Sequence, residues 1–380
     1  MKRSLVWLAL AALGLVGTVP AQNKPRARGL GVPFDGSPGP LDAITDVAGV
    51  EVGHTTLIRG DGAAAVRTGV TAVLPRGKGS FDQVFAGWFS LNGNGEMTGT
   101  TWIEEGGLLE GPILITNTHS VGVVRDAVIA WRLRHAPPDA GGYAWSLPVV
   151  AETWDGYLND ANGFHVKESD VFAALDGAAG GRVAEGNVGG GTGMVCHEFK
   201  GGIGTASRKL DSAEPGGYTV GVLVQANYGL RRQLRIAGVP VGQEIAEPSP
   251  RREEEGSIIV VVATDAPLLP HQLKRLARRV PLGLARMGST SGNGSGDIFI
   301  AFSTANPGAA RSSGTISLTM LPNERMSPLF DAVAGAVEES VCNALVAAET
   351  MTGRDGHRVV ALPHDRLKEV LRKYSRLVER

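Results

Sequence analysis

Four short segments place polar side chains where an apolar, β-prone run begins or ends. Residues 151–156 (AETWDG) and 225–229 (QANYG) follow such runs, and residues 292–297 (GNGSGD) precede one. The fourth segment is Gly256-Ser257, which opens the run SIIVVVATD. Carboxylate, amide and hydroxyl groups at strand ends can bind an ammonium group, donate to an oxyanion or attack a carbonyl. Asn, Asp and Gly are also ordinary turn residues, so each segment alone has a plain structural interpretation.

Other chemistries leave no signature in this chain. The eight histidines show neither H-x-H nor H-E-x-x-H spacing, so we expect no metal centre. No serine lies in a G-x-S-x-G elbow, which disfavours an α/β-hydrolase triad. There is no P-loop, and residues 189–193 (GGGTG) lack the spacing of a dinucleotide loop. We therefore expect no organic cofactor, and a tight backbone-lined pocket at these glycines.

Composition narrows the class of protein. Hydrophobic residues make up 43% of the chain and charged residues 20%, which allows a substantial core and argues against global disorder. The net charge is −1, and no run of Lys or Arg exceeds a pair. The chain therefore has no electrostatic footprint for nucleic acid or for an anionic membrane.

The N-terminus predicts export. Lys2 and Arg3 precede an apolar run over residues 5–16, and small residues follow at Val19 and Ala21. This pattern is typical of a signal peptide, residues 1–21, cut before Gln22. A membrane anchor is disfavoured because the apolar run is shorter than the ~20 residues that a span needs. The mature protein is expected to be periplasmic or secreted and not bound to a membrane.

Two cysteines, Cys196 and Cys342, could pair in an oxidising compartment. The sequence cannot show that they are close enough to do so. The favoured interpretation is two buried, small hydrophobic residues.

The elements that must position the polar segments can be predicted from the apolar patterns. Short apolar runs predict strands at residues 50–52, 112–116, 147–151, 218–225, 258–264, 298–303 and 315–320. Helical spacing occurs in residues 120–134, 267–285, 327–350 and 363–377. The order is that of a mixed α/β protein without the regular alternation of a parallel barrel.

Two segments fall outside these elements. Residues 22–40 are rich in Pro, Gly and Arg, which predicts an extended arm. Residues 242–255 (GQEIAEPSPRREEE) are polar and proline-bearing, which predicts an exposed linker. This linker leads directly into Gly256-Ser257. On this feature alone, an ordinary surface loop entering a central strand is the favoured interpretation.

The motifs, taken together and in order, resemble a known family. With residues 85–105 and 113–128, they are similar to the L-aminopeptidase/D-esterases and β-peptidyl aminopeptidases, which are related to ornithine acetyltransferase. The resemblance runs from Arg28 to the end of the 327–350 helix. It implies an α/β fold of the α+β type: a four-layer αββα sandwich, Ntn-hydrolase-like with a distinct topology. It also implies self-cleavage of a single catalytic domain, residues 22–380, into fragments 22–256 and 257–380.

The resemblance assigns roles to residues. Gly256-Ser257 matches the self-cleavage junction, which makes Ser257 a new N-terminus and the nucleophile. Asn227 matches an amide that donates to the oxyanion. Glu152 matches the acid that receives the ammonium group of the substrate. A homo-oligomer of cleaved heterodimers is implied by the family only.

Two positions depart from the family pattern. Ser295 and Asp297 match a Ser-x-acid pair beside the nucleophile, where some members have Glu instead of the shorter Asp. Trp154 stands where many aminopeptidases of the family have Tyr, whose hydroxyl is implicated in stabilising charge. An indole N–H can donate a hydrogen bond but cannot transfer a proton in that way. The substrate-binding role of Trp154 is therefore open.

Self-cleavage would solve a chemical problem. A serine hydroxyl is a weak nucleophile until a base takes its proton, and no histidine lies near Ser257 in the sequence. Cleavage frees an α-amine, whose pKa is roughly 8 in model peptides and which can accept that proton near neutral pH. Gly256 allows the strained backbone that the cut requires. The sequence leaves open whether the amine or the Ser295/Asp297 pair is the main base.

These observations predict an exported, self-processing serine aminopeptidase acting on small peptides, amino-acid amides or esters. An acyltransferase of the ornithine acetyltransferase type is the nearest alternative. It is disfavoured by the signal peptide and by a Ser where those enzymes use Thr. A non-catalytic periplasmic protein that retains the fold is the third hypothesis, and it predicts an intact chain. Whether the substrate is L-α, D- or β-configured stays open.

Overall fold

The computed structural model describes residues 24–136, 145–211, 216–245, 247–248, 250 and 256–379. The predicted signal peptide lies outside the described residues, as does the end of the predicted linker, residues 251–255. Within the described ranges, no helix is long and apolar enough to cross a membrane.

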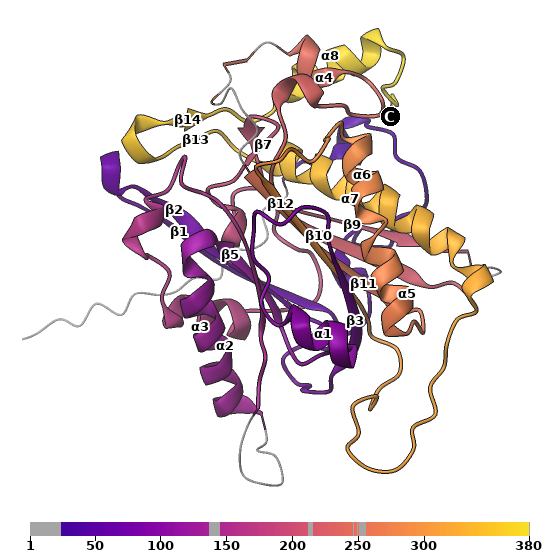
Figure 1. Ribbon diagram of the computed structural model, residues 1–380. Helices are drawn as coiled ribbons and strands as arrows, with labels where there is room; N and C mark the ends of the chain where they lie inside the picture. Colours follow the sequence, from indigo (N-terminus) through magenta and orange to yellow (C-terminus); the bar gives the residue numbers. More distant parts are fainter. Residues whose placement is uncertain are drawn as a thin grey trace, which may run out of the picture.

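Two β-sheets form the centre of the molecule (Figure 1). The smaller sheet has the strand order β1-β2-β5-β6, with bounds Glu51–Arg59, Val66–Leu74, Ile113–Asn117 and Val149–Thr153. The larger has the order β4-β3-β12-β11-β10-β9, with bounds Leu108–Leu109, Val84–Ser90, Ser295–Ser303, Gly256–Thr264, Thr219–Asn227 and Gly202–Lys209. In the larger sheet β11 and β12 run parallel, whereas β10 is antiparallel to β11.

Alternation along the strands builds three apolar layers. In β10, Leu223 belongs to a buried cluster that also holds Ile113 and Ile115 of β5, so the two sheets face each other. The neighbouring Val222 and Val224 belong to a second cluster on the opposite face of the larger sheet. A third cluster covers the outer face of the smaller sheet.

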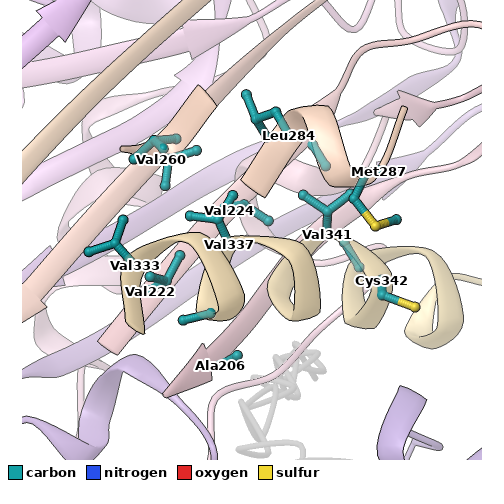
Figure 2. Close-up of a cluster of buried hydrophobic side chains, with 14 of the residues drawn as sticks. Ala206, Val222, Val224, Val260, Leu284, Met287, Val333, Val337, Val341 and Cys342 are labelled. Atoms are coloured by element: carbon teal, nitrogen blue, oxygen red, sulfur yellow. The ribbon is translucent and has the colours of Figure 1, made fainter. Parts of the chain in front are cut away.

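Helices cover both outer faces. α2 (Val121–His135) and α3 (Glu168–Asp176) pack on the smaller sheet. α5 (Pro270–Ala277), α6 (Val280–Arg286) and α7 (Ser327–Ala347) pack on the larger one, where Figure 2 shows side chains of α6 and α7 gathered with those of β10 and β11. The resulting order of helices, sheet, sheet and helices is the four-layer αββα sandwich that the family resemblance implied.

Several smaller elements complete the described chain. They are α1 (Thr100–Gly106), α4 (Val241–Glu244), α8 (His364–Lys373), the hairpin β7 (Val195–Cys196) with β8 (Phe199–Lys200), and the hairpin β13 (Met351–Thr352) with β14 (Arg358–Val359). Cys196 and Cys342 are buried and free, as the sequence favoured.

The strand predicted at residues 315–320 is wrong. The segment is irregular, and its alternating apolar side chains Ile316, Leu318 and Met320 are exposed. The segment lies in the connection between β12 and α7, away from any strand that could pair with it (Figure 1). The backbone of Thr319 bonds instead to the side chain of Asn306, donating to Oδ1 at 2.8 Å and accepting from Nδ2 at 2.9 Å. The β-propensity of this segment is therefore not enough to make it a strand, because no described strand lies beside it to share backbone hydrogen bonds.

The single helix predicted over residues 267–285 is two helices, α5 and α6. Pro281 lies in the first turn of α6, where its missing N–H costs no hydrogen bond. A proline at this position cannot continue a helix from α5, so the two helices are separate. The sequence also missed the strands β2, β3 and β9. Glycine weakens the β pattern of β9, yet Gly204 is required there, since a Cβ would collide with the Ser340 carbonyl of α7.

The exposed linker predicted at residues 242–255 is wrong at its start. Gly242 and Glu244 lie in α4, and Ile245 is buried. Glu244 pairs with Lys373 of α8 at 2.9 Å. The predicted N-terminal arm is anchored in the same way, because Arg28 pairs with the fully buried Glu339 of α7 at 2.7 Å. Polar composition did not reveal these specific partners.

Candidate active site

Strand register brings Ser257, Asn227, Ser295 and Asp297 together at one end of the central strands of the larger sheet. Ser257, the second residue of β11, lies directly opposite Asn227, the last residue of β10. In β12, Gly296 is level with Ser257, so Ser295 and Asp297 flank it. The start of β11, the start of β12 and the end of β10 therefore coincide. Glu152 comes from the end of β6 in the smaller sheet.

A cleft of about 710 Å³ opens at this end of the strands. Ser257, Glu152 and Trp154 line it, together with Thr118 and the loop of residues 93–96. Ser257 is only 3% exposed, whereas Trp154 is 37% exposed and forms part of the rim. The cleft thus joins a buried hydroxyl to a buried carboxylate, from two different sheets.

Both oxygens of Glu152 are held by donors. Oε1 accepts the backbone N–H of Glu96 at 3.0 Å, and Oε2 accepts the hydroxyl of Thr118. Burial raises the pKa of Glu152 above its ordinary value, and these two hydrogen bonds counteract part of that rise. A fixed, buried carboxylate facing a cleft can pair with a cationic group of a ligand.

The side-chain amide of Asn227 is fixed at both ends. Its Oδ1 accepts the N–H of Val195 at 2.8 Å, and its Nδ2 donates to the backbone carbonyl of Trp154 at 2.8 Å. An amide nitrogen carries two hydrogens, and the contact with the Trp154 carbonyl uses one. The second N–H can serve another acceptor, and Asn227 lies opposite Ser257 in the ladder.

Ser295 and Asp297 form a hydrogen-bonded pair. The Ser295 hydroxyl donates to Asp297 Oδ1 at 2.5 Å. Burial raises the pKa of Asp297, while hydrogen bonds from Ser295, from Ser291 and from the backbone of Ile258 hold it down. Among the described residues, no hydrogen bond joins this pair to the Ser257 hydroxyl in the uncut chain.

Gly256 stands where no side chain fits. A Cβ at this position would collide with the carbonyl oxygen of Asn227 on the neighbouring strand. Gly296 is restricted similarly, by the carbonyl of Asn94. Close backbone approach, rather than a turn, explains glycine at the junction.

Comparisons with known proteins identify the family of the chain. Residues 42–359 match the model of peptidase family S58. This chain belongs to peptidase family S58. It is therefore a hydrolase of the aminopeptidase type, as the sequence predicted.

Named relatives of this S58 peptidase cover nearly all of its length. It is 54% identical to the beta-peptidyl aminopeptidase BapA of Sphingosinicella microcystinivorans, over 97% of each chain. Among solved structures, it is 52% identical to a beta-aminopeptidase of Burkholderia sp., with a TM-score of 0.86, over 92% of this chain and 99% of that one. It is 51% identical to the L-aminopeptidase D-Ala-esterase/amidase of Ochrobactrum anthropi, with a TM-score of 0.87, over 93% and 100%. That enzyme is described as a new variant of the Ntn hydrolase fold.

Several site residues of this S58 peptidase were not singled out from the sequence. Thr118 orients Glu152, and Asn92 accepts the N–H of Asp297 at 2.8 Å. Asn94 donates to the carbonyl of Gly294 at 2.9 Å, which ties the loop of residues 93–96 to the start of β12. The family resemblance included both segments, but a Thr or Asn in a Gly-rich loop has no local signal of function.

Trp154 contributes through its backbone as well as its ring. Its carbonyl orients the Asn227 amide, and a tyrosine could do the same. The indole lies over Gly156, where a Cβ would come within 2.6 Å of the ring. The side chain is thus held at the rim of the cleft, close in sequence to Glu152.

Proposed function

We propose that this S58 aminopeptidase is exported, cuts itself between Gly256 and Ser257, and then uses the N-terminal Ser257 as its nucleophile. The observation that carries the proposal is that Ser257 and Glu152 line one cleft, while Asn227 lies opposite Ser257 in the ladder, beside a junction that accepts only glycine. Each group has the chemistry that one step of aminopeptidase catalysis needs.

Self-cleavage would begin with attack of Ser257 Oγ on the carbonyl carbon of Gly256. The C–N bond breaks as the hydroxyl proton passes to the departing nitrogen, which leaves an ester and a free α-amine. Water then hydrolyses the ester and releases the Gly256 carboxylate. The second N–H of Asn227 is suited to stabilise the oxyanion of this step, since Asn227 lies opposite Ser257 in the ladder.

Turnover would use the same groups in a second reaction. The free α-amine of Ser257 takes the hydroxyl proton, and Oγ attacks the carbonyl of the substrate. Asn227 donates to the oxyanion, and the proton passes to the leaving amine. Water hydrolyses the acyl-enzyme. Glu152 holds the ammonium group throughout, which restricts the substrates to those with a free N-terminus.

The two fragments would stay together after the cut. β10 of the heavy fragment and β11 of the light fragment share a full antiparallel ladder. A buried ionic cluster joins them on the other side of the sheet, where Arg28 and Arg208 both contact Glu339 at 2.7 Å. We propose that the cleaved heterodimers form a homo-oligomer, as in the sequence prediction.

We further propose that peptides with an N-terminal β-amino acid are among the substrates. The supporting evidence is the name shared by two curated relatives, at 54% and 50% identity, and the Burkholderia enzyme. The Ochrobactrum enzyme is equally similar and is named for L- and D-configured substrates. An experiment must therefore distinguish β-amino-acid substrates from L- and D-configured α-amino-acid substrates.

The test compares p-nitroanilides of β-homoalanine, L-alanine and D-alanine with purified, cleaved enzyme. The proposal predicts hydrolysis of the β-homoalanine compound and none of its N-acetylated form. Ser257→Ala should abolish hydrolysis of all of them. Activity that survives in Ser257→Ala would contradict the nucleophile, whereas activity on L-alanine alone would contradict only the substrate class.

A further inference from the structure

Lys200 is a buried lysine whose side-chain nitrogen is held by backbone carbonyls. It lies in β8, is 0% exposed, and forms no ion pair with a carboxylate among the residues that the structure describes. Its Nζ donates to the backbone carbonyls of Met194 at 2.7 Å, Gly201 at 2.8 Å and Gly191 at 3.5 Å. Burial, followed by the Lys24 ammonium, lowers the pKa of Lys200 to about 7. An ammonium in such a place costs stability that an apolar side chain would not, so its presence needs an explanation.

The explanation is in the peptide unit between Met194 and Val195. The carbonyl oxygen of this unit accepts the Lys200 ammonium at 2.7 Å. The N–H of the same unit donates to Oδ1 of Asn227 at 2.8 Å. One rigid, planar group therefore connects the buried cation to the amide that faces Ser257 in the ladder.

A charge at the carbonyl end of a peptide strengthens the donor at its other end. Hydrogen bonds in a chain polarise one another, and those that involve an ion are stronger than neutral ones. A stronger hydrogen bond to Asn227 Oδ1 withdraws electrons from Nδ2 and makes its remaining N–H a better donor. It also fixes the amide orientation, because a flipped amide would face the Val195 N–H with its own NH₂ group.

We propose that Lys200 is a positioning residue, which orients and polarises the Asn227 amide through the Met194–Val195 peptide for its contact with the oxyanion. The inference rests on the oxyanion role proposed above for Asn227. Lys200 itself touches neither the substrate nor Ser257. It acts through the hairpin β7–β8, which packs beside the end of β10.

The test replaces the ammonium by an apolar side chain of similar length, Lys200→Met. On an aminoacyl p-nitroanilide, with kcat counted per cut chain, kcat should fall about 10-fold or more, toward the ~10²–10³ expected for losing an oxyanion donor. KM should stay within about twofold, because the ammonium site at Glu152 is unchanged. Lys209→Met is the control, since Lys209 is an exposed lysine on β9, and it should leave kcat unchanged.

A double-mutant cycle separates positioning from general stability. In the Asn227→Ala background, Lys200→Met should cost no further activity, because the amide through which it acts is gone. Additive losses, or an unchanged kcat in Lys200→Met, would overturn the inference. If Asn227→Ala alone keeps full activity, the oxyanion role fails first and the inference falls with it. Should Lys200→Met not fold, Lys200→Gln, which keeps an N–H donor but no charge, replaces it in the same cycle.

Discussion

Ser257 and Asn227 are opposed residues in the antiparallel pair of β11 and β10. This relationship places the amide and the hydroxyl on neighbouring strands of one rigid ladder. The donor is in turn fixed by Val195 and by the Trp154 carbonyl. Pre-organised donors of this kind stabilise an oxyanion without reorganising during the reaction.

Asn227→Ala should therefore lower kcat by about 10²–10³, as expected for loss of one oxyanion donor. It should also lower the free energy of unfolding by about 1–3 kcal/mol, because the Val195 N–H loses its buried acceptor. Steady-state kinetics and thermal unfolding measure the two effects. The control is Asn187→Ala, whose amide binds the backbone of Glu349 away from the cleft and which should lose stability with kcat unchanged.

Glu152→Gln should weaken binding of substrates with a free N-terminus. The neutral amide keeps the shape of the side chain but loses the charge that pairs with an ammonium group. A charged hydrogen bond contributes about 1.5–3 kcal/mol, which corresponds to a roughly 10- to 150-fold loss in kcat/KM. The exposed Glu104→Gln is the control and should behave as wild type. Equal kcat/KM for Glu152→Gln and wild type would place the ammonium site elsewhere.

The same carboxylate predicts an acid limb in the pH profile. Burial raises the pKa of Glu152, so it takes up a proton at a higher pH than an exposed glutamate. kcat/KM should fall as the pH falls through this raised pKa, because the protonated acid no longer pairs with the ammonium. The raised pKa of Glu152 affects folding stability in the opposite direction from kcat/KM. The folded state binds this proton more tightly than the unfolded state, so the contribution is present at low pH and is lost as the pH rises through the folded pKa.

Kinetics and thermal unfolding across the same pH series measure both effects. In Glu152→Gln the limb that belongs to this group should disappear. An identical acid limb in that variant would assign the limb to another residue.

Gly256→Ala should stop or strongly slow self-cleavage. The added methyl group would collide with the carbonyl of Asn227, so the start of β11 must move away from β10. The amount of uncut chain on a denaturing gel over time measures the effect. Gly79→Ala is the control, because a Cβ there meets no atom within 4 Å. Cleavage of Gly256→Ala at the wild-type rate would show that the junction tolerates displacement.

The sequence predicted the parts of the site that lie at strand ends. Ser257, Asn227 and Glu152 each adjoin an apolar run whose end can be located along the chain, and the family resemblance then assigned them roles. Thr118, Val195 and Lys200 could not be predicted in the same way, because their roles depend on contacts between distant segments. The failed strand at residues 315–320 has the same cause, since propensity is local and pairing is not.

The most direct measurement is N-terminal sequencing of each band that the purified protein gives on a denaturing gel. The account predicts two bands, with the smaller one beginning Ser-Ile-Ile-Val at Ser257. It also predicts one uncut band for Ser257→Ala. A fully active wild-type enzyme that migrates as a single chain, with Gly256 still joined to Ser257, would contradict it.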